Sequence, residues 1–280
     1  MYDLLLVRRR RRRKIAALVS LFSSMGITSL IIVSFLGQNT GTFTVSITNS
    51  TVKLSLCKKS TFAQDERTTY LRIDKLDQFE EYTYTNVLFD DLDDENKEFN
   101  YGAQDVKDKD GKTVSVLPYL KYTFYVGNMG NKAARYTLNV NLLECTASLD
   151  GRTLDDTLRV MVYENDINDS YGNIEHNVAV YAKETSRTNK DIDGNPTKRE
   201  FISRHDRTYT ETENFPLATS FDSLKRIAKY DRGGFYSGQI RRYTLVTWLE
   251  GEDDDSLTGE GEPIGASLKL GVEITAYENE

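Results

Sequence analysis

The sequence has few of the residues that mark several common protein classes. Only four prolines occur among its 280 residues, so the chain is not a rigid proline-rich stalk. It has two histidines and no H-E-x-x-H pair, which excludes a helical zinc-protease site. His205 lies beside Asp206 in a polar segment, which favours a solvated loop histidine over a catalytic one. No G-x-S-x-G segment occurs, so the nucleophile elbow of the α/β-hydrolases is absent as well.

Positive charge is scarce outside the N-terminus. The chain has 36 basic and 43 acidic residues, but seven of the basic residues, Arg8 to Lys14, precede a long apolar run. From Gly37 onward 29 basic and 42 acidic residues follow, a net charge of about −13. Because nucleic-acid binding needs a positive surface, this balance argues against nucleic acid as a partner.

The long apolar run extends from Ile15 to Leu36 and contains no charged residue. A helix of this length spans about 33 Å, which is enough to cross a hydrocarbon core of about 30 Å. Because the basic block lies on its N-terminal side, residues 1–14 are expected to form a cytoplasmic tail. We therefore expect a single-pass protein of the cell membrane, with a signal anchor at residues 15–36 and an extracellular domain at residues 37–280.

A cleaved signal peptide is the alternative to a retained anchor. Cleavage sites carry small residues of the A-x-A kind, which Phe35 and Leu36 fit poorly. Ser34 and Gly37 are compatible with a cut. The sequence favours retention and leaves secretion open. A buried core helix is a weaker alternative, because the run has no polar face.

Apolar and polar residues alternate repeatedly after the apolar run, which predicts β-strands with one buried face. In the first strand, Phe43, Val45 and Ile47 alternate with threonine and serine. Further strands are predicted at residues 52–56, 70–73, 82–88, 119–126, 136–142, 158–163, 178–182, 243–249 and 266–277. About ten strands and almost no helix predict an all-β fold, an antiparallel β-sandwich of the jelly-roll type.

Further predictions concern one turn, the final strand and three insertions. Residues 127–131 are predicted to form the turn of a hairpin between two consecutive strands. The strand at residues 266–277 is expected to be the longest and to lie inside a sheet. Polar, acidic insertions are expected to form surface loops, at residues 89–110, 164–176 and 183–216.

One short helix is predicted at residues 220–230. Phe221, Leu224, Ile227 and Ala228 would fall on one helical face, and Ser220 is a suitable N-cap residue.

Two cysteines, Cys57 and Cys145, would face an oxidising compartment outside the cell. A disulfide between them would close a long loop and contribute about 4–5 kcal/mol in the chain-entropy model. Two unpaired thiols are the alternative, because distance along the sequence does not fix distance in space.

One segment has the ligand spacing of an EF-hand calcium loop. Oxygen-bearing side chains occupy loop positions 1, 3, 5, 9 and 12, with glycine at position 6. The candidate ligands for weak Ca²⁺ binding are Asn189, Asp191, Asp193 and Glu200. Pro196 at position 8, asparagine at position 1 and the lack of flanking helices favour a hairpin with an Asp-Gly turn instead. The acidic runs at residues 90–95 and 252–255 are further weak candidates, although most charge runs are simply solvated.

Several segments together resemble a group of uncharacterised membrane-anchored surface proteins of Gram-positive bacteria. These segments are G-T-F-T-V at 41–45, Y-T-F-Y-V at 122–126, L-R-V-M-V-Y at 158–163, V-Y-A-K at 180–183 and Y-T-L-V-T-W-L-E-G at 243–251. More distantly, the chain is similar to the TasA/camelysin family of biofilm-matrix proteins. That likeness rests on an export signal, a following strand and a hairpin with an asparagine-containing turn at Asn128.

The family likeness implies a jelly-roll sandwich that assembles into extracellular fibres by lending an N-terminal strand to a neighbour. In this chain the lent strand would be Thr42 to Ile47. The chain departs from the family in its uncleaved anchor and its longer acidic insertions, and both departures oppose free fibre assembly.

The sequence therefore predicts a non-enzymatic, membrane-anchored surface protein with a structural, adhesive, matrix or envelope role. One alternative is a secreted fibre-forming matrix protein, released by signal cleavage. Another is an accessory or sensory ectodomain of a membrane complex. The expected partners are the membrane, a protein or cell-surface component, and a second copy bound through the first strand.

Overall fold

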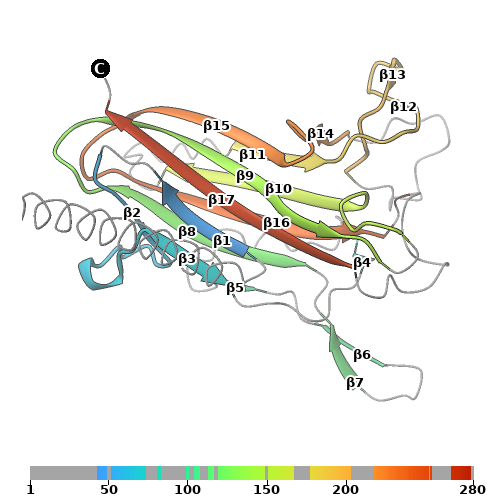
Figure 1. Ribbon diagram of the computed structural model, residues 1–280, viewed down its shortest axis with the longest axis horizontal. Coiled ribbons are helices and arrows are strands. Elements are labelled where there is room, and N and C mark those ends of the chain that lie inside the picture. The colour runs from blue at the N-terminus through green and yellow to red at the C-terminus, as the bar shows by residue number, and fades with distance from the viewer. Residues whose placement is uncertain are drawn as a thin grey trace, which may run out of the picture. The chain divides into compact units, whose positions relative to one another are not determined.

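The chain divides into two compact units, Met1–Gly41 and Thr42–Glu280. The computed structural model describes residues of the second unit only (Figure 1). The described residues are 43–48, 52–73, 81–82, 99–100, 104–107, 113–116, 119–148, 151–166, 177–202, 217–251, 253 and 266–278. The predicted anchor at residues 15–36 lies outside them. None of the described elements is a helix of the length and apolarity that a membrane crossing demands.

The described residues form two large sheets. The five-stranded sheet has the order β15 (Arg226–Phe235), β9 (Ala134–Thr146), β17 (Ser267–Glu278), β1 (Phe43–Thr48) and β3 (Tyr70–Ile73). The eight-stranded sheet has the order β14 (Thr219–Ser220), β11 (Asn177–Ala182), β10 (Leu158–Asp166), β16 (Ile240–Glu250), β8 (Leu120–Asn128) and β2 (Leu54–Cys57). Beside this row, β4 (Glu81–Tyr82) pairs with β16 and β5 (Phe99–Asn100) pairs with β8.

Two small hairpins and one short helix complete the described elements. The hairpins are β6 (Gln104–Lys107) with β7 (Thr113–Val116), and β12 (Asn189–Lys190) with β13 (Pro196–Thr197). The 3-10 helix η1 covers Gln64–Glu66. Most strand pairs are antiparallel, and the parallel pairs are β1 with β17, β11 with β14 and β4 with β16.

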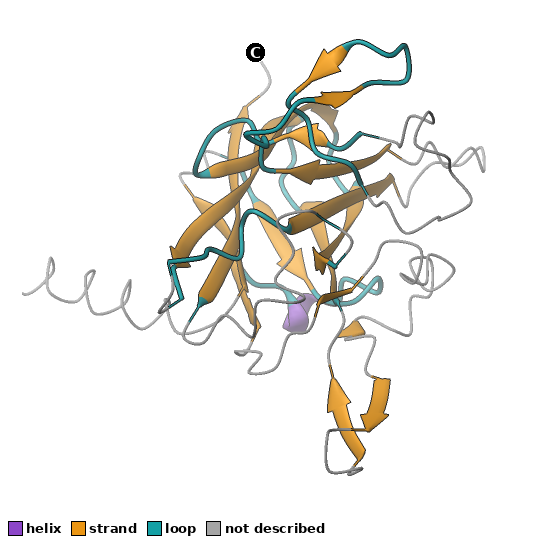
Figure 2. Cartoon of the chain, turned by 90° about the vertical axis from the view of Figure 1, so that its right-hand side faces the viewer, coloured by secondary structure: helices purple, strands orange, loops and turns teal. Residues whose placement is uncertain are grey.

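The two large sheets face each other and share one core (Figure 2). Fully buried residues come from both, for example Val45, Leu138 and Ile274 from the five-stranded sheet and Phe124 and Val160 from the other. Burying an aliphatic or aromatic side chain of this size contributes about 1.5–3 kcal/mol. The all-β expectation is therefore confirmed, with two packed layers of strands.

The eight-stranded sheet is also covered on its second face. Met161, Val246 and Trp248 are fully buried there, in a separate apolar cluster. On the same face, Tyr125 of β8 is buried in a third cluster with Cys57 and Phe62. β8 is buried at every position, whereas β9 alternates between buried and more exposed residues. A strand covered on both faces loses the period-two pattern.

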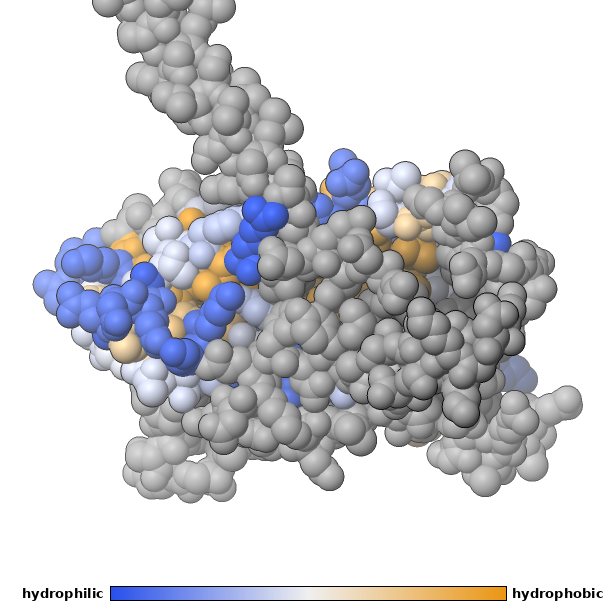
Figure 3. Space-filling view, turned by 90° about the horizontal axis from the view of Figure 1, so that it is seen from below, coloured by the Kyte–Doolittle hydropathy of each residue, from blue (hydrophilic) through white to orange (hydrophobic). Residues whose placement is uncertain are grey.

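Few of the large apolar side chains that the structure describes are exposed. The exposed ones are scattered over the described residues, at Leu143, Val178, Ile192, Leu224, Tyr236 and Tyr277. On the face shown in Figure 3, hydrophilic residues gather at the left-hand end and apolar residues show between them. A largely polar exterior agrees with the acidic composition of residues 37–280.

Most of the predicted strands are present at the expected positions. β3 has the predicted bounds, and β17 lies inside its sheet between β9 and β1. The expectation that β17 would be the longest strand is wrong, since β9 has 13 residues and β17 has 12. The insertion predicted at residues 164–176 begins inside β10, and the one at residues 183–216 contains β12 and β13.

The predicted hairpin around residues 127–131 is wrong. β8 belongs to the eight-stranded sheet and β9 to the five-stranded sheet, so this connection crosses between layers. Asn128 fixes the crossing. Its buried amide nitrogen donates to the carbonyl oxygens of Lys132, at 2.9 Å, and Phe235, at 2.8 Å. Its side-chain oxygen accepts a hydrogen bond from the backbone nitrogen of Gly130, at 3.0 Å.

The predicted helix at residues 220–230 is also wrong, because this segment enters β15. A register shift between Arg226 and Ala228 places Ile227 and Ala228, two consecutive residues, in the core. Such a bulge imitates part of a helical pattern. Leu224, which a helix would bury on the same face, is 83% exposed.

We predict that Asn128→Ala destabilises the fold by about 2–4 kcal/mol, because one buried and two partly buried hydrogen bonds are lost and their backbone partners are left unsatisfied. Urea unfolding measures the change. Asn131→Ala, an exposed position in the same connection, is the matched control and should stay within about 0.5 kcal/mol of the wild type. Equal stability of the two variants would contradict this role of Asn128.

Candidate functional site

The predicted calcium segment forms the β12–β13 hairpin, which agrees with the Asp-Gly turn interpretation. The Asp191 carboxylate accepts hydrogen bonds from the backbone nitrogens of Asp193, at 3.0 Å, and Asn195, at 2.8 Å. These backbone bonds hold the pKa of Asp191 below its usual range. Gly194 has a φ of 81°, a left-handed conformation that suits glycine. Asp191 therefore closes the turn.

Of the other three candidate ligands, Asp193 is exposed, and Asn189 and Glu200 have partners elsewhere. The buried Asn189 amide donates to the carbonyl oxygen of Arg199 at 2.6 Å. Glu200 is buried, and its Oε2 lies 4.0 Å from Arg159 Nη2. No group of three or more His, Cys, Asp or Glu residues within the described ranges is arranged to hold a metal ion. The four candidates share one segment without forming a common oxygen shell.

Sequence reasoning missed a buried charge cluster centred on Arg159. Arg159 is the second residue of β10, is 1% exposed and alternates with the core residues Leu158 and Val160. Its Nη2 lies 2.5 Å from Asp253 Oδ2, and its Nε donates to the carbonyl oxygen of Phe201 at 2.9 Å. The cluster therefore joins the sheet to two segments far away in the sequence.

The Arg159 cluster fastens the segment at residues 183–202 to the outer face of the eight-stranded sheet. The same segment is held by a bond from the Ala218 nitrogen to the Glu200 carbonyl oxygen, at 2.7 Å, and by Arg199 Nε to the Ala218 carbonyl oxygen, at 2.8 Å. Trp248 lies directly opposite Arg159 and donates to Glu250 Oε2 at 3.0 Å. A buried, paired arrangement of this kind fits a structural clamp.

A second polar network crosses the core between the two sheets. Arg232 of β15 donates from Nε to both Glu164 oxygens, at 2.8 Å each. Tyr243 of β16 donates to Glu164 Oε1 at 2.6 Å, and its hydroxyl lies 2.6 Å from that of Tyr136 in β9. Arg241 Nη1 extends the network to the Tyr136 hydroxyl, at 3.4 Å.

The network keeps its groups in fixed protonation states. Burial alone would raise the pKa of Glu164, but the hydrogen bonds from Arg232 and Tyr243 bring it below its ordinary value. Burial and the neighbouring Tyr136 and Glu164 raise the pKa of Tyr243 well above its ordinary value. At neutral pH Glu164 is an ionised acceptor and Tyr243 a protonated donor. This suits a structural link better than proton transfer.

We predict that Glu164→Gln destabilises the fold by about 2–3 kcal/mol at neutral pH, because Arg232 loses its partner. The depressed pKa makes the Glu164 contribution full above its unfolded value of 4.5. The contribution is lost as the pH falls through the lower folded pKa. Urea unfolding across this acidic range should therefore show the difference between wild type and variant shrinking. Glu184→Gln, at an exposed site, is the control, and a difference that does not change with pH would contradict the assignment.

The two cysteines are both free and lie in different sheets, so the candidate disulfide is not formed in this structure. Cys57 is buried against Phe62 and Tyr125. Cys145 Sγ donates to Asp155 Oδ1 at 3.3 Å. Burial and the Asp155 carboxylate raise the pKa of the Cys145 thiol to about 11. Both thiols are therefore poor nucleophiles in the folded chain.

We predict that both thiols react slowly with a disulfide reagent in the folded protein. After unfolding in denaturant without reductant, both free thiols should react. Cys57→Ser and Cys145→Ser each remove one of the two reactive groups. Thiols that appear only after reduction would show that the disulfide forms in solution.

The first strand is already paired on both edges. β1 runs parallel to β17 and antiparallel to β3, and Val45 is fully buried. A neighbour could receive this strand only after it left both partners. Self-association through it stays a prediction.

Several predicted features lie wholly or partly outside the described residues. These are residues 15–36, the predicted strand at 82–88 except for Tyr82, most of the insertion at 89–110 including the acidic run at 90–95, His176, His205 and, except for Asp253, the acidic run at 252–255.

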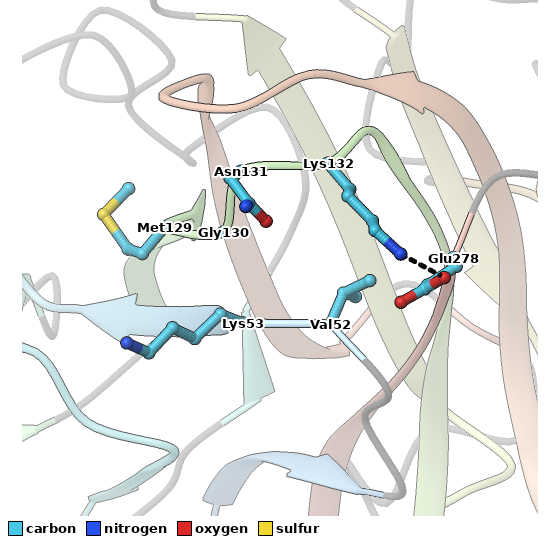
Figure 4. A pocket seen from close by; sticks show the side chains of 7 residues that line it. All are labelled: Val52, Lys53, Met129, Gly130, Asn131, Lys132 and Glu278. Atoms are coloured by element: carbon cyan, nitrogen blue, oxygen red, sulfur yellow. Dashed lines mark hydrogen bonds and ion pairs between the residues drawn. The ribbon is translucent and has the colours of Figure 1, made fainter.

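An open hollow of about 460 Å³ lies beside the β8–β9 connection (Figure 4). Its lining residues are Val52, Lys53, Met129, Gly130, Asn131, Lys132 and Glu278. Asn131 and Val52 point into the space between the two chain segments. Lys132 Nζ lies 3.0 Å from Glu278 Oε2.

In comparisons with known proteins, no family model, curated protein or solved structure matches this chain.

Proposed function

We propose that the chain is a non-enzymatic surface protein held at the cell membrane by residues 15–36, with residues 37–280 outside the cell. Its role would be structural or adhesive, in the matrix or envelope. The observation that carries the proposal is the arginine block followed by an uncharged apolar run, which leads almost directly into β1. Only residues 37–42 separate the run from β1, a reach of about 20 Å when fully extended.

The folded unit supports a scaffold role in this proposal. Two charged pairs lie inside it: the buried Arg159 with Asp253, and the buried Glu164 with the partly buried Arg232. They link segments that are distant in sequence. Charged side chains that pair with each other in this way suit a rigid surface domain. They suit an active site less well, because its side chains must exchange a proton or attack a substrate.

We further propose that the two layers form a jelly-roll-like sandwich. Passing along the chain, β1, β2 and β3 alternate between the two sheets, and β8, β9 and β10 do so again. β15, β16 and β17 repeat the alternation. Repeated crossing between two facing sheets is typical of jelly rolls.

A secreted, fibre-forming matrix protein is the second candidate. It is favoured by Ser34 and Gly37, which are compatible with cleavage, and by the position of β1 directly after the apolar run. An accessory or sensory ectodomain is the third candidate, and the short tail at residues 1–14 neither favours nor opposes it.

The proposal predicts that protease added to intact cells digests residues 37–280 and spares an epitope tag at the N-terminus. The full-length chain should fractionate with membranes. Replacing Arg8 to Arg13 with glutamine should weaken this orientation, because the positive-inside signal is reduced. Protection of the C-terminal domain would overturn the proposed topology. Recovery in the medium, with a new N-terminus near Gln38, would favour the fibre-forming candidate.

A further inference from the structure

The tip of the β12–β13 hairpin combines an exposed apolar side chain with acidic neighbours. Ile192 is 84% exposed at the tip and lies between Asp191 and Asp193. Neither aspartate forms an ion pair with a described residue, although Asp191 accepts the turn hydrogen bonds given above. The hairpin projects from the sheets (Figures 1 and 2). It therefore presents one aliphatic group between two carboxylates at its tip, with the exposed Lys190, Lys198 and Arg199 farther along the hairpin.

The hollow beside the β8–β9 connection has the complementary chemistry. Val52 supplies an apolar surface, and Lys53 is exposed and forms no ion pair with any residue that the structure describes. Lys132 is neutralised by Glu278, so Lys53 provides the surplus positive charge. The volume of about 460 Å³ is large enough for a hairpin tip to enter.

The hairpin and the hollow lie at opposite ends of the folded unit. The hairpin segment follows Ala182, which pairs with Arg159 at the start of β10. The hollow lies beside Asn128, and Gly127 pairs with Ile240 at the far end of β16. Figure 1 shows the hairpin at the right and the β8–β9 connection at the left. A chain cannot fill its own hollow with its own tip across this distance.

We propose that the hairpin tip of one copy docks in the hollow of a second copy. Ile192 would pack against Val52, and Asp193 would pair with Lys53. Because the two surfaces differ, the contact is heterologous and can continue from copy to copy. The contact involves neither β1 nor residues 15–36, so a result for or against it does not test the proposed anchor. The small contact is expected to be weak, which makes cross-linking a suitable assay.

The test uses the full-length chain in detergent, in two forms that keep the proposed contact residues. Lys190→Cys places a thiol beside the tip, and Asn131→Cys places one at the hollow. A short bis-maleimide should link a mixture of the two forms about tenfold more than a mixture in which Lys229→Cys replaces Lys190→Cys. Lys229 is exposed and lies in the middle of β15. Chains without a new cysteine report the background from Cys57 and Cys145.

A second substitution in the cross-linking chain distinguishes a specific contact from chance collision. In the Lys190→Cys chain, Ile192→Asp should lower the yield about tenfold, because burial of the aliphatic side chain is lost. Leu224→Asp changes a residue of equal exposure, 83% against 84%, and should leave the yield unchanged. Unaltered thermal unfolding confirms that each variant is folded. Equal effects of Ile192→Asp and Leu224→Asp would overturn the proposal.

Charge exchange tests the pairing directly. Asp193→Lys on the tip chain and Lys53→Glu on the hollow chain should each lower the yield several-fold, by about the amount that a rim ion pair contributes. Combining the two should restore it. Failure of the combination to restore cross-linking, or a yield no higher than with Lys229→Cys, would show that the hollow does not receive the tip of a second copy.

Discussion

The buried cluster of Arg159 and Asp253 connects three distant parts of the sequence on the outer face of the eight-stranded sheet. Arg159 lies at the start of β10, Asp253 follows β16, and Phe201 belongs to the inserted segment. A guanidinium that is 1% exposed must be fully paired, because an isolated buried charge would be prohibitively costly. The position of the inserted segment, and the burial of Trp248 beneath it, both depend on this pairing.

The Glu164 network has the corresponding role in the core. Glu164 occupies the core-facing position of β10 that follows Val162. It accepts hydrogen bonds from Arg232 of the opposite sheet, and Tyr243 links it to Tyr136 of that sheet. Apolar packing alone would allow the two layers to slide, since it is not directional. Directional hydrogen bonds fix their relative register. The fold thus combines a non-directional core with two charged links, one between the layers and one on the outer face.

The strands could be predicted from sequence because alternation of apolar and polar residues is a local property. Their distribution between sheets could not. The segment around Asn128 has the composition of a hairpin turn, yet its decisive bond goes to the Phe235 carbonyl oxygen, 107 residues away. The bulge at Ile227 similarly imitated a helix, because two consecutive residues of β15 face the core.

Candidate sites were harder to predict than strands. The segment from Asn189 to Glu200 has oxygen-bearing side chains at the spacing of a calcium loop. In the folded chain, however, Asn189 and Glu200 contact other protein groups. Arg159 gave no signal, because in the sequence it is an ordinary polar residue between two apolar ones. Arg159 is buried because the segment at residues 183–202 packs over it. No local sequence pattern predicts that contact.

The position of β1 determines how the fold would bear mechanical load. Tension applied at its N-terminal end acts along the strand, where β1 is hydrogen-bonded to β17 on one edge and to β3 on the other. Force in this direction strains the bonds of both edges together instead of opening them one after another. Extraction of the strand must also pull Val45 out of the core. A domain attached through β1 would therefore resist pulling by shear, and its rate of forced unfolding, more than its equilibrium stability, would set how long it holds.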